Sequence, residues 1–573
     1  GMVNNPDQPA GLETYVPTTS TVRYLPRVGH HIYNGSAWVN EGVLHESEDR
    51  TNLIVYSQDF ASGSWSVRKT DSVTILAAQA IGADGNTSLS KVSITDTTHE
   101  DHGIQYSGLT IPVDTDYTLS IDVEDIDQRY VSLWFYKGTN VWVNSTFDLT
   151  LGTTSDQEGS TGGTITASRV ENVGGGLYRL SITAQCTTGF TLAGFLFASS
   201  ATPTLSNIGL EAYAGVAGVG VNAGAAQLEE GSTPSSYIPN AGATDGVTRV
   251  AETLTVPAAN MPWPTTVVTG STIASGDAAS DDTNSTGNWF KRITNGTDPQ
   301  ATTAVEITSQ SAVKNTGTYA LKFDFDGSTQ ASGFVDLNDF SPVAGATYKL
   351  KFSAKVEGTP NLRISVDNSN AFAYNADVRV LSTTSTSGWT DYETVIVASS
   401  IRYFIVRSQQ SGGATTTVYL DGMTLEPADP LSVSIQMDGR MTYADTGDVE
   451  AIPMRWRVDG SNKIVWAVTT NGAKTGRLDI AQSSGGVDDV VPSISNYYTP
   501  GINVPFNIAS RHGSTFVNGA VDGTALTANT TPTALPYLQA TDFELGYDFM
   551  GTIGGLRVWA DDLGDTGIAE ATL

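Results

Sequence analysis

Cysteine is almost absent from this sequence, which has one, Cys186, in 573 residues. A single cysteine excludes any disulfide within the chain and argues against a secreted framework held together by disulfides. Cys186 ends the alternating stretch Leu180–Cys186 (LSITAQC). We therefore expect it to lie in a strand as a small buried apolar residue.

Basic residues are scarce as well, because Lys and Arg number 30 against 60 Asp and Glu, for a formal net charge of −30. There is no basic run, so the sequence predicts no binding to nucleic acid and no attraction to anionic membranes. No apolar stretch reaches the roughly 18 residues of a membrane span, which predicts no membrane insertion. The first residues have no basic and apolar signal pattern, so we expect no signal peptide.

What the chain has in abundance is short alternating stretches separated by Gly, Ser, Thr, Asn and Asp. No long segment shows a helical period. At about 150 residues per domain, this length predicts three or four domains. Many short strands with frequent turns are typical of β-sandwiches, so we predict an all-β protein.

The stretch Val504–Ala560 shows the strand pattern most clearly. Apolar and polar residues alternate through Phe506–Ala509 and Ile553–Trp559, and Asn518-Gly519 and Asp522-Gly523 supply turns. In order and spacing the stretch resembles the end of a laminin-G/concanavalin-like jelly roll. That resemblance implies that the domain also needs a strand from earlier in the chain.

A second resemblance rests on two distant motifs. The first contains Gly42, Leu44, Glu46, Arg50, Thr51, Asn52, Leu53, Tyr56, Ser57, Asp59, Phe60 and Trp65. The second reads Ala226–Gly231 (AQLEEG), Pro234–Pro239 (PSSYIP) and Val247-Thr248-Arg249. Both, in this order, resemble tailed-phage and prophage structural proteins. The resemblance implies a carbohydrate-binding-module-like jelly roll between the motifs and a place in the virion, with other virion proteins as partners.

A further unit, from about Gly270 to Asp429, repeats the first jelly roll at low identity. Asn315–Phe323 parallels Gly85–Val92, and Ala346–Ala354 parallels Asp116–Val123. This unit resembles the carbohydrate-binding modules attached to xylanases and cellulases. We therefore expect two jelly rolls of one type.

The position of the second jelly roll predicts an insertion. Val247–Pro264 precedes it and Leu431–Asp445 follows it at once, and in the resembling phage proteins such segments are nearly contiguous. The fold class we predict is all-β with three β-sandwich domains, the second inserted into the third. The boundaries are an irregular segment at 1–50, a jelly roll at 51–246, an inserted jelly roll at 268–429, and a laminin-G-like sandwich from 247–267 plus 430–573. The alternative is three consecutive domains with 247–269 as a linker.

No catalytic motif stands out. We find no paired carboxylates on one strand of the kind that glycoside hydrolysis needs, no Gly-x-Ser-x-Gly, no P-loop and no His-Glu-x-x-His. The sequence thus predicts that the protein is not an enzyme. The cluster His99–His102 would place its side chains on both faces of a strand, so they cannot all reach one metal ion.

Sugar and calcium binding are the remaining expectations. Sugars are held by aromatic faces and planar polar side chains. Trp134, Tyr136, Trp289 and Phe334 are available for this, and we select Trp142, Tyr374, Trp389, Arg402 and Tyr403 as candidate carbohydrate-binding residues. Structural calcium is common in such jelly rolls and takes hard oxygen ligands. Asp421 matches the last-strand Asp of those modules, with Asp281 and Asp282 as candidate loop partners.

The function we predict is a non-enzymatic phage or prophage virion protein that binds surface carbohydrate through its jelly rolls. It would act in the virion, outside the cell after lysis. One alternative is a glycan-degrading enzyme with accessory binding modules. The other is a structural virion component that binds no sugar.

Overall fold

The computed structural model describes residues 27–62, 64–82, 87–261, 289–293, 304–317, 319–337, 347–358, 362–367, 378–382, 388–397, 403–409, 412–427, 432–441, 450–469, 478–492, 504–536, 538 and 541–573. In this part of the chain nearly all regular structure is antiparallel sheet. The two helical elements described are the 3₁₀ turn η1 (Ala258–Asn260) and α1 (Gly564–Ala571). Neither is long and apolar enough to cross a membrane. The all-β prediction is confirmed.

The first jelly roll is a sandwich of two six-stranded sheets. One sheet runs, in spatial order, β12 (Thr153–Glu158), β11 (Val141–Asp148), β10 (Tyr130–Gly138), β15 (Leu192–Phe197), β8 (Gly103–Ser107) and β4 (Trp65–Val67). The other runs β13 (Gly163–Gly174), β14 (Leu177–Cys186), β9 (Tyr117–Asp125), β17 (Gly220–Glu230), β6 (Thr87–Ile94) and β5 (Val73–Ile81). Two short pairs accompany them, β7 (His99–Glu100) with β16 (Tyr213–Ala214), and β3 (Arg50–Asn52) with β18 (Val247–Arg249).

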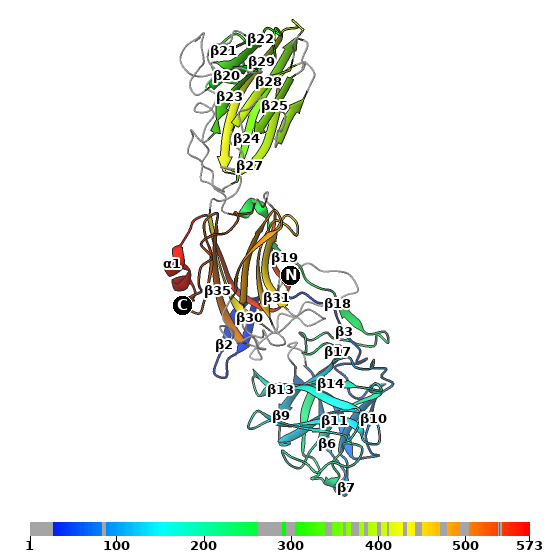
Figure 1. Ribbon diagram of the computed structural model, residues 1–573. Helices are drawn as coiled ribbons and strands as arrows, with labels where there is room; N and C mark the ends of the chain where they lie inside the picture. The colour runs from blue at the N-terminus through cyan, green and yellow to red at the C-terminus, as the bar shows by residue number, and fades with distance from the viewer. Residues whose placement is uncertain are drawn as a thin grey trace.

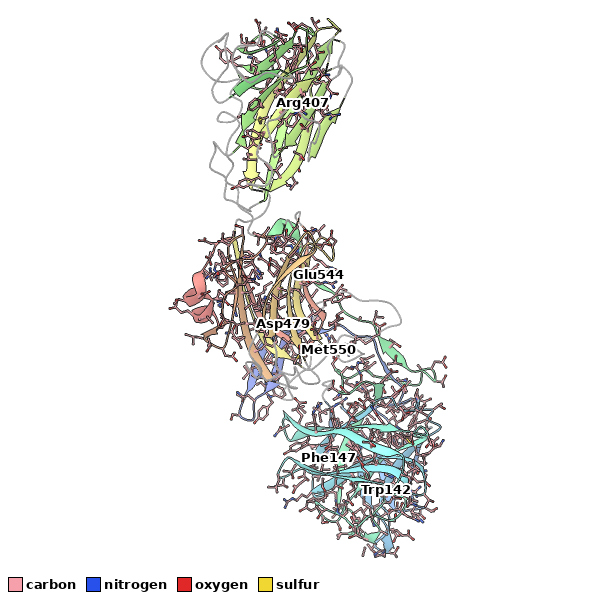
Figure 2. The ribbon with its side chains drawn as sticks, viewed as in Figure 1. Trp142, Phe147, Arg407, Asp479, Glu544 and Met550 are labelled. Atoms are coloured by element: carbon pink, nitrogen blue, oxygen red, sulfur yellow. The ribbon has the colours of Figure 1, made fainter. Side chains whose placement is uncertain are left out.

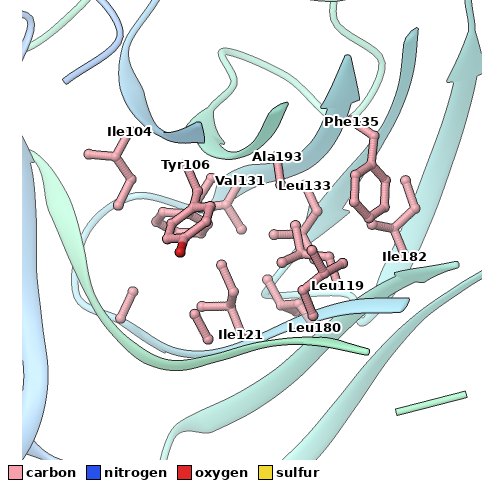
Figure 3. Packing of buried hydrophobic residues seen from close by; sticks show 14 of the residues in the cluster. Ile104, Tyr106, Leu119, Ile121, Val131, Leu133, Phe135, Leu180, Ile182 and Ala193 are labelled. Atoms are coloured by element: carbon pink, nitrogen blue, oxygen red, sulfur yellow. The ribbon is translucent and has the colours of Figure 1, made fainter. Parts of the chain in front are cut away.

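The core of the first jelly roll comes from alternate residues on both sheets, as the period of two requires. Leu119 and Ile121 on β9 meet Val131 and Leu133 on β10, and all four are fully buried (Figure 3). Cys186 is buried at the end of β14, as predicted.

The second jelly roll is a sandwich of two five-stranded sheets. One runs β20 (Trp289–Ile293), β23 (Ala331–Asp336), β28 (Tyr403–Ser408), β25 (Leu362–Asp367) and β26 (Val378–Ser382). The other runs β21 (Val305–Gln310), β22 (Ala320–Phe325), β29 (Thr416–Pro427), β24 (Thr347–Gly358) and β27 (Thr390–Val397). Its own core includes Phe323, Leu350, Phe404 and Leu420.

The third sandwich, which we call the host sandwich, is assembled from three separate parts of the chain. Its seven-stranded sheet runs β1 (Arg27–Tyr33), β2 (Trp38–Glu46), β39 (Met550–Trp559), β30 (Ser432–Met441), β35 (Val504–Gly513), β36 (Val517–Val521) and β37 (Thr524–Ala525). Its six-stranded sheet runs β19 (Leu254–Val256), β38 (Phe543–Asp548), β31 (Glu450–Arg457), β32 (Lys463–Thr469), β33 (Leu478–Ser484) and β34 (Val487–Pro492).

The predicted insertion of the second jelly roll into the third domain is confirmed. β19 precedes the second jelly roll and pairs with β38, which follows it, with Thr255 opposite Glu544. The first jelly roll is enclosed in the same way, because β2 precedes it and pairs with β39. The host sandwich accordingly lies between the two jelly rolls (Figure 1).

The N-terminal part of the chain differs from the prediction. An irregular segment was expected at 1–50, but Arg27–Glu46 forms a hairpin that extends the seven-stranded sheet of the host sandwich. Two register shifts interrupt β1, and of β2 only the last three residues are buried, so neither strand shows a clean alternation. The turn is ordinary, with Asn34 Oδ1 accepting from the amides of Ser36 and Ala37.

Candidate functional site

The predicted carbohydrate-binding residues do not form one site. Trp142 lies in the first jelly roll (Figure 2). It is 7 % exposed, and its Nε1 donates to the carbonyl of Asn207 at 3.1 Å, so its ring has no open face for a sugar. Trp389 is half-buried and tilted against Tyr419 of β29, 6.3 Å between centroids. Tyr403 is half-buried on β28 of the opposite sheet. Tyr374 and Arg402 lie outside the described residues.

Tyr403 packs against an aromatic residue of the neighbouring strand. The buried ring of Phe334 meets it edge-on at 5.9 Å. Trp389 and Tyr403 thus belong to opposite sheets of the second jelly roll, and one sugar cannot contact both. Tyr403 remains a candidate on its own sheet face.

The predicted calcium ligand Asp421 already serves as a cap for backbone amides. Its Oδ2 accepts from the amides of Asn315 at 2.6 Å and Thr316 at 2.7 Å, and its Oδ1 from the amide of Gly422 at 2.7 Å. No group of three or more His, Cys, Asp or Glu side chains suited to a metal occurs among the described residues. Asp281 and Asp282 lie outside them, so calcium stays a prediction.

Asp421 gives a test that separates the two roles. We expect Asp421→Asn to destabilise the second jelly roll by about 1–3 kcal/mol, because the amide nitrogen of Asn cannot accept from backbone amides. The measurement is thermal unfolding by calorimetry, with and without calcium. If Asp421 is only a cap, calcium should leave the unfolding temperature of the wild type unchanged. A calcium-dependent rise that Asp421→Asn abolishes would instead establish the ion site.

An aromatic stack lies on the outer face of the first jelly roll. Val131, Leu133 and Phe135 of β10 point into the core, so Trp134 and Tyr136 point outward. Their rings stack at 5.1 Å with 25° between planes. Trp134 is buried and Tyr136 is half-buried above it.

Planar polar side chains border this stack. Arg68 lies 5.7 Å from the Trp134 ring, and it donates from Nη1 to Gln105 Oε1 at 2.8 Å and from Nε to Asp101 at 2.9 Å. We call Arg68, Gln105, Trp134 and Tyr136 the Tyr136 face. An aromatic surface beside a guanidinium and an amide provides both the stacking and the directional hydrogen bonds by which sugars are recognised.

A strap formed by residues 199–212 covers the rest of this sheet face. Its backbone carbonyls accept from side chains of the sheet: Asn207 from Trp142, Ile208 from Trp134 Nε1 at 3.0 Å, and Gly209 from Asn144 Nδ2 at 3.0 Å. The carboxylate of Glu211 holds the two ends of the strap together by accepting from the amide of Ser199 at 2.7 Å. The strap therefore takes up donors that a ligand would otherwise use and limits the open surface to the Tyr136 face.

A small cleft, with room for about one water, remains between strap and sheet. Asp101, His102, Ser132, Asn144 and Glu211 contribute its polar lining. His102 is itself 1 % exposed, and its Nε2 lies 3.0 Å from the carbonyl oxygen of Tyr213. The cluster His99–His102 is thus divided between a surface strand and the interior.

The motifs that resemble phage proteins meet at the junction of the host sandwich and the first jelly roll. Glu46, at the end of β2, accepts from Arg27 at 2.6 Å, from Arg249 at 2.9 Å, and from the amide and hydroxyl of Ser236 at 2.7 and 2.6 Å. Arg27 also pairs with Glu252 at 2.8 Å. We call these five residues the ionic clasp.

The ionic clasp is buried and electrostatically strong. Burial by itself would raise the pKa of Glu46, but Arg249, Arg27 and the Ser236 donors outweigh it and hold that pKa well below its usual range. Burial lowers the pKa of the Arg249 guanidinium, against the opposing pull of Glu46. The clasp therefore holds fixed ionised groups where two sandwiches join.

Other motif residues serve the same junction. Asn52 Nδ2 donates to the carbonyls of Ala226 and Ile238, and its Oδ1 accepts from the amide of Leu228. Arg50 pairs with Glu48 at 2.6 Å and donates to the Glu230 carbonyl. Gly231, at φ +132°, is required because a Cβ there would collide with the Arg50 guanidinium. The motifs are accounted for by structure rather than by a ligand.

Sequence reasoning noted Trp134 and Tyr136 but did not select them, and it missed Arg68 and Gln105. The alternation in Tyr130–Tyr136 (YVSLWFY) does place Ser132, Trp134 and Tyr136 on one face. Arg68 and Gln105 could not be placed beside this face from the sequence, because their position depends on the order of strands in the sheet. β15 separates β10 from β8, which carries Gln105, and no local pattern gives that order.

No family model and no curated protein matches the chain. Among solved structures, it is similar to the N-terminal CBM22-1–CBM22-2 tandem domain of Xyn10C from Paenibacillus barcinonensis, at 14 % identity over 66 % of this chain and 97 % of that one, with a TM-score of 0.18. It is also similar to domains LG4–5 of the mouse laminin α1 chain, at 7 % identity over 81 % of this chain and 86 % of that one, with a TM-score of 0.18. We base the function on the residues described above rather than on these likenesses.

Proposed function

We propose that this chain is a non-enzymatic carbohydrate-binding protein and that the Tyr136 face of its first jelly roll contacts the sugar. The observation that carries the proposal is the stacked pair of buried Trp134 and half-buried Tyr136, bordered by Arg68 and Gln105. The buried Trp134 ring supports the Tyr136 ring from below, so the platform is fixed before a ligand arrives. Such preorganisation lowers the entropic cost of binding.

We further propose that the protein belongs to a phage or prophage virion, where it acts in adhesion outside the cell after lysis, alongside other virion proteins. What supports this part is the pair of motifs at residues 42–65 and 226–249, in the order found in the phage proteins that they resemble. The ionic clasp gives those motifs a physical role in joining two sandwiches. A rigid junction suits a protein that has to present binding domains at a distance from its anchor.

The test of sugar binding is a glycan array probed with the whole chain, followed by titration calorimetry with the best ligand. We expect Tyr136→Ala to weaken that binding about ten-fold or more, because it removes the exposed half of the platform. Tyr33→Ala, a Tyr-to-Ala change in the host sandwich, should leave the affinity unchanged.

Three outcomes would count against the proposal. Binding that survives Tyr136→Ala at full strength would move the site away from this face. An array without any selective signal would favour the structural virion component. Release of shorter sugars from a bound polysaccharide would instead favour the glycan-degrading enzyme.

A further inference from the structure

A bulge in β38 of the host sandwich places an aromatic side chain on the outer face of its sheet. Leu545 lies opposite Met454 and Asp548 opposite Ile452, so Gly546 and Tyr547 both face the single residue Pro453. Gly546 has a φ of +65°, and a Cβ there would lie 2.3 Å from the His45 ring, so glycine is needed at this point. Bulges often re-aim a side chain in this way. Tyr547 is 46 % exposed as a result.

Arg455 fixes the ring of Tyr547 from beneath. Its guanidinium carbon lies 3.1 Å from the ring centroid, and the residue is 8 % exposed. It is held in place by Glu544, directly opposite on β38, which accepts from its Nε. A tyrosine with one face on a buried arginine and nearly half of its surface open is a ready platform for a flat ligand.

One more cation stands at the rim of this platform, and another lies beside it on the next strand. Arg457 lies 5.9 Å from the Tyr547 ring, its side chain is 41 % exposed, and its contact with Glu544 is long, at 3.9 Å. Lys463 of β32 is directly opposite Arg457 in the sheet. Like charges in directly opposed positions repel each other, and an anion beside them would relieve that repulsion. Arg455, Arg457 and Lys463 give this part of the sheet three cations beside the carboxylates of Glu544 and Asp548, although the whole chain carries −30.

We propose that Tyr547, Arg455, Arg457 and Lys463 form a second carbohydrate site, on the host sandwich, which binds an anionic saccharide. The pyranose ring stacks on Tyr547, and a carboxylate or sulfate of the sugar is bound by Arg457 and Lys463. This proposal extends the proposed function to acidic glycans. It involves none of the residues of the Tyr136 face, so either site can fail without the other.

The experiment is binding of the whole chain to polygalacturonate, dextran sulfate and neutral dextran by affinity electrophoresis. We expect retardation by at least one anionic polymer and none by neutral dextran. We expect Tyr547→Ala to weaken the interaction about ten-fold and Tyr547→Phe to preserve it, since Phe keeps the ring. Raising the salt from about 0.05 M to about 0.5 M should weaken it as well, because the rim charges are exposed.

Matched variants separate this site from its alternatives. Tyr33→Ala and Lys69→Ala, which lie outside both proposed sites, should leave binding to the anionic polymer unchanged. Arg457→Ala combined with Lys463→Ala should abolish it. Thermal unfolding checks that each variant folds. The proposal is overturned if Tyr547→Ala binds like the wild type, or if polyglutamate binds as well as the sugars, which would indicate a site for acidic polymers in general.

Discussion

Replacing Glu46 with Ala should destabilise the protein by about 3–5 kcal/mol, because it leaves the buried guanidinium groups of Arg27 and Arg249 without their shared carboxylate. The side chain of Glu46 is 3 % exposed, so water cannot take its place. The variant also removes the acceptor for the amide and hydroxyl of Ser236. Calorimetry of the whole chain should show a lower transition temperature, and limited proteolysis should cut faster between Gly231 and Arg249.

The matched control is Glu100→Ala, which removes an exposed pair in which Glu100 lies 3.6 Å from Lys69. Exposed pairs contribute between about 0 and 1 kcal/mol, so this variant should unfold like the wild type. If Glu46→Ala were as stable as Glu100→Ala, the clasp would not hold the junction. The motifs would then need another explanation, and the case for a role in the virion surface would be open again.

The clasp also predicts a dependence on acid. The folded-state pKa of Glu46 is lowered, so its stabilising effect is present above the pKa of an unfolded Glu, about 4.3. That effect is lost as the pH falls below this value toward the folded-state pKa, because the unfolded chain then binds the proton first. The loss of stability in acid should therefore be smaller in Glu46→Ala than in the wild type.

The extent to which this fold can be predicted from sequence depends on where each contact partner lies in the chain. Alternation in stretches such as Tyr130–Tyr136 predicts strands with a core face, and the structure confirms the all-β class. Alternation fails for β1 and β2, because the hairpin is bulged and half-exposed. A local pattern cannot show that Val43 of β2 pairs with Ile553 of β39, because both jelly rolls lie between these two strands in the chain.

The candidate sites were harder to predict than the fold for a related reason. Trp142 is flanked by polar turn residues and looks accessible in sequence. Its indole, however, donates to the carbonyl of Asn207 in the strap, four strands later in the chain. The sequence does not show that the carboxylate of Asp421 accepts from the backbone amides of Asn315 and Thr316, because these residues lie about 105 positions away in the chain. Tyr547 follows a glycine that marks the bulge, and only the register with β31 shows that its ring meets Arg455.

His512 predicts the second large effect, a loss of stability of the host sandwich between about pH 6.5 and pH 3. Its side chain is fully buried on β35, and that burial lowers its pKa from 6.5 to about 3. Its Nε2 lies 2.9 Å from Ser510 Oγ, which also accepts from Trp466 Nε1 at 2.9 Å. Below pH 6.5 the imidazole of His512 binds a proton in the unfolded chain but not in the folded chain. The free energy of unfolding therefore falls as the pH falls.

The size of this effect follows from the difference between the two pKa values and amounts to about 4–5 kcal/mol once the pH reaches 3. We expect His512→Gln, which cannot be protonated, to remove that part of the pH dependence. The substitution can itself change stability at pH 8, so the quantity to compare is the change in unfolding free energy between pH 8 and pH 4 in each protein.

Carboxylates such as Glu46 titrate in both proteins and cancel in the comparison, which isolates the contribution of the imidazole. Calorimetry should show the difference in one transition only, because the cores of the two jelly rolls do not include His512. Equal slopes against pH in wild type and His512→Gln would mean that the folded host sandwich accepts the proton. In that case its interior near Ser510 would have to open to water at mild acid, and the sandwich that joins both jelly rolls would be the part of the protein that acid loosens first.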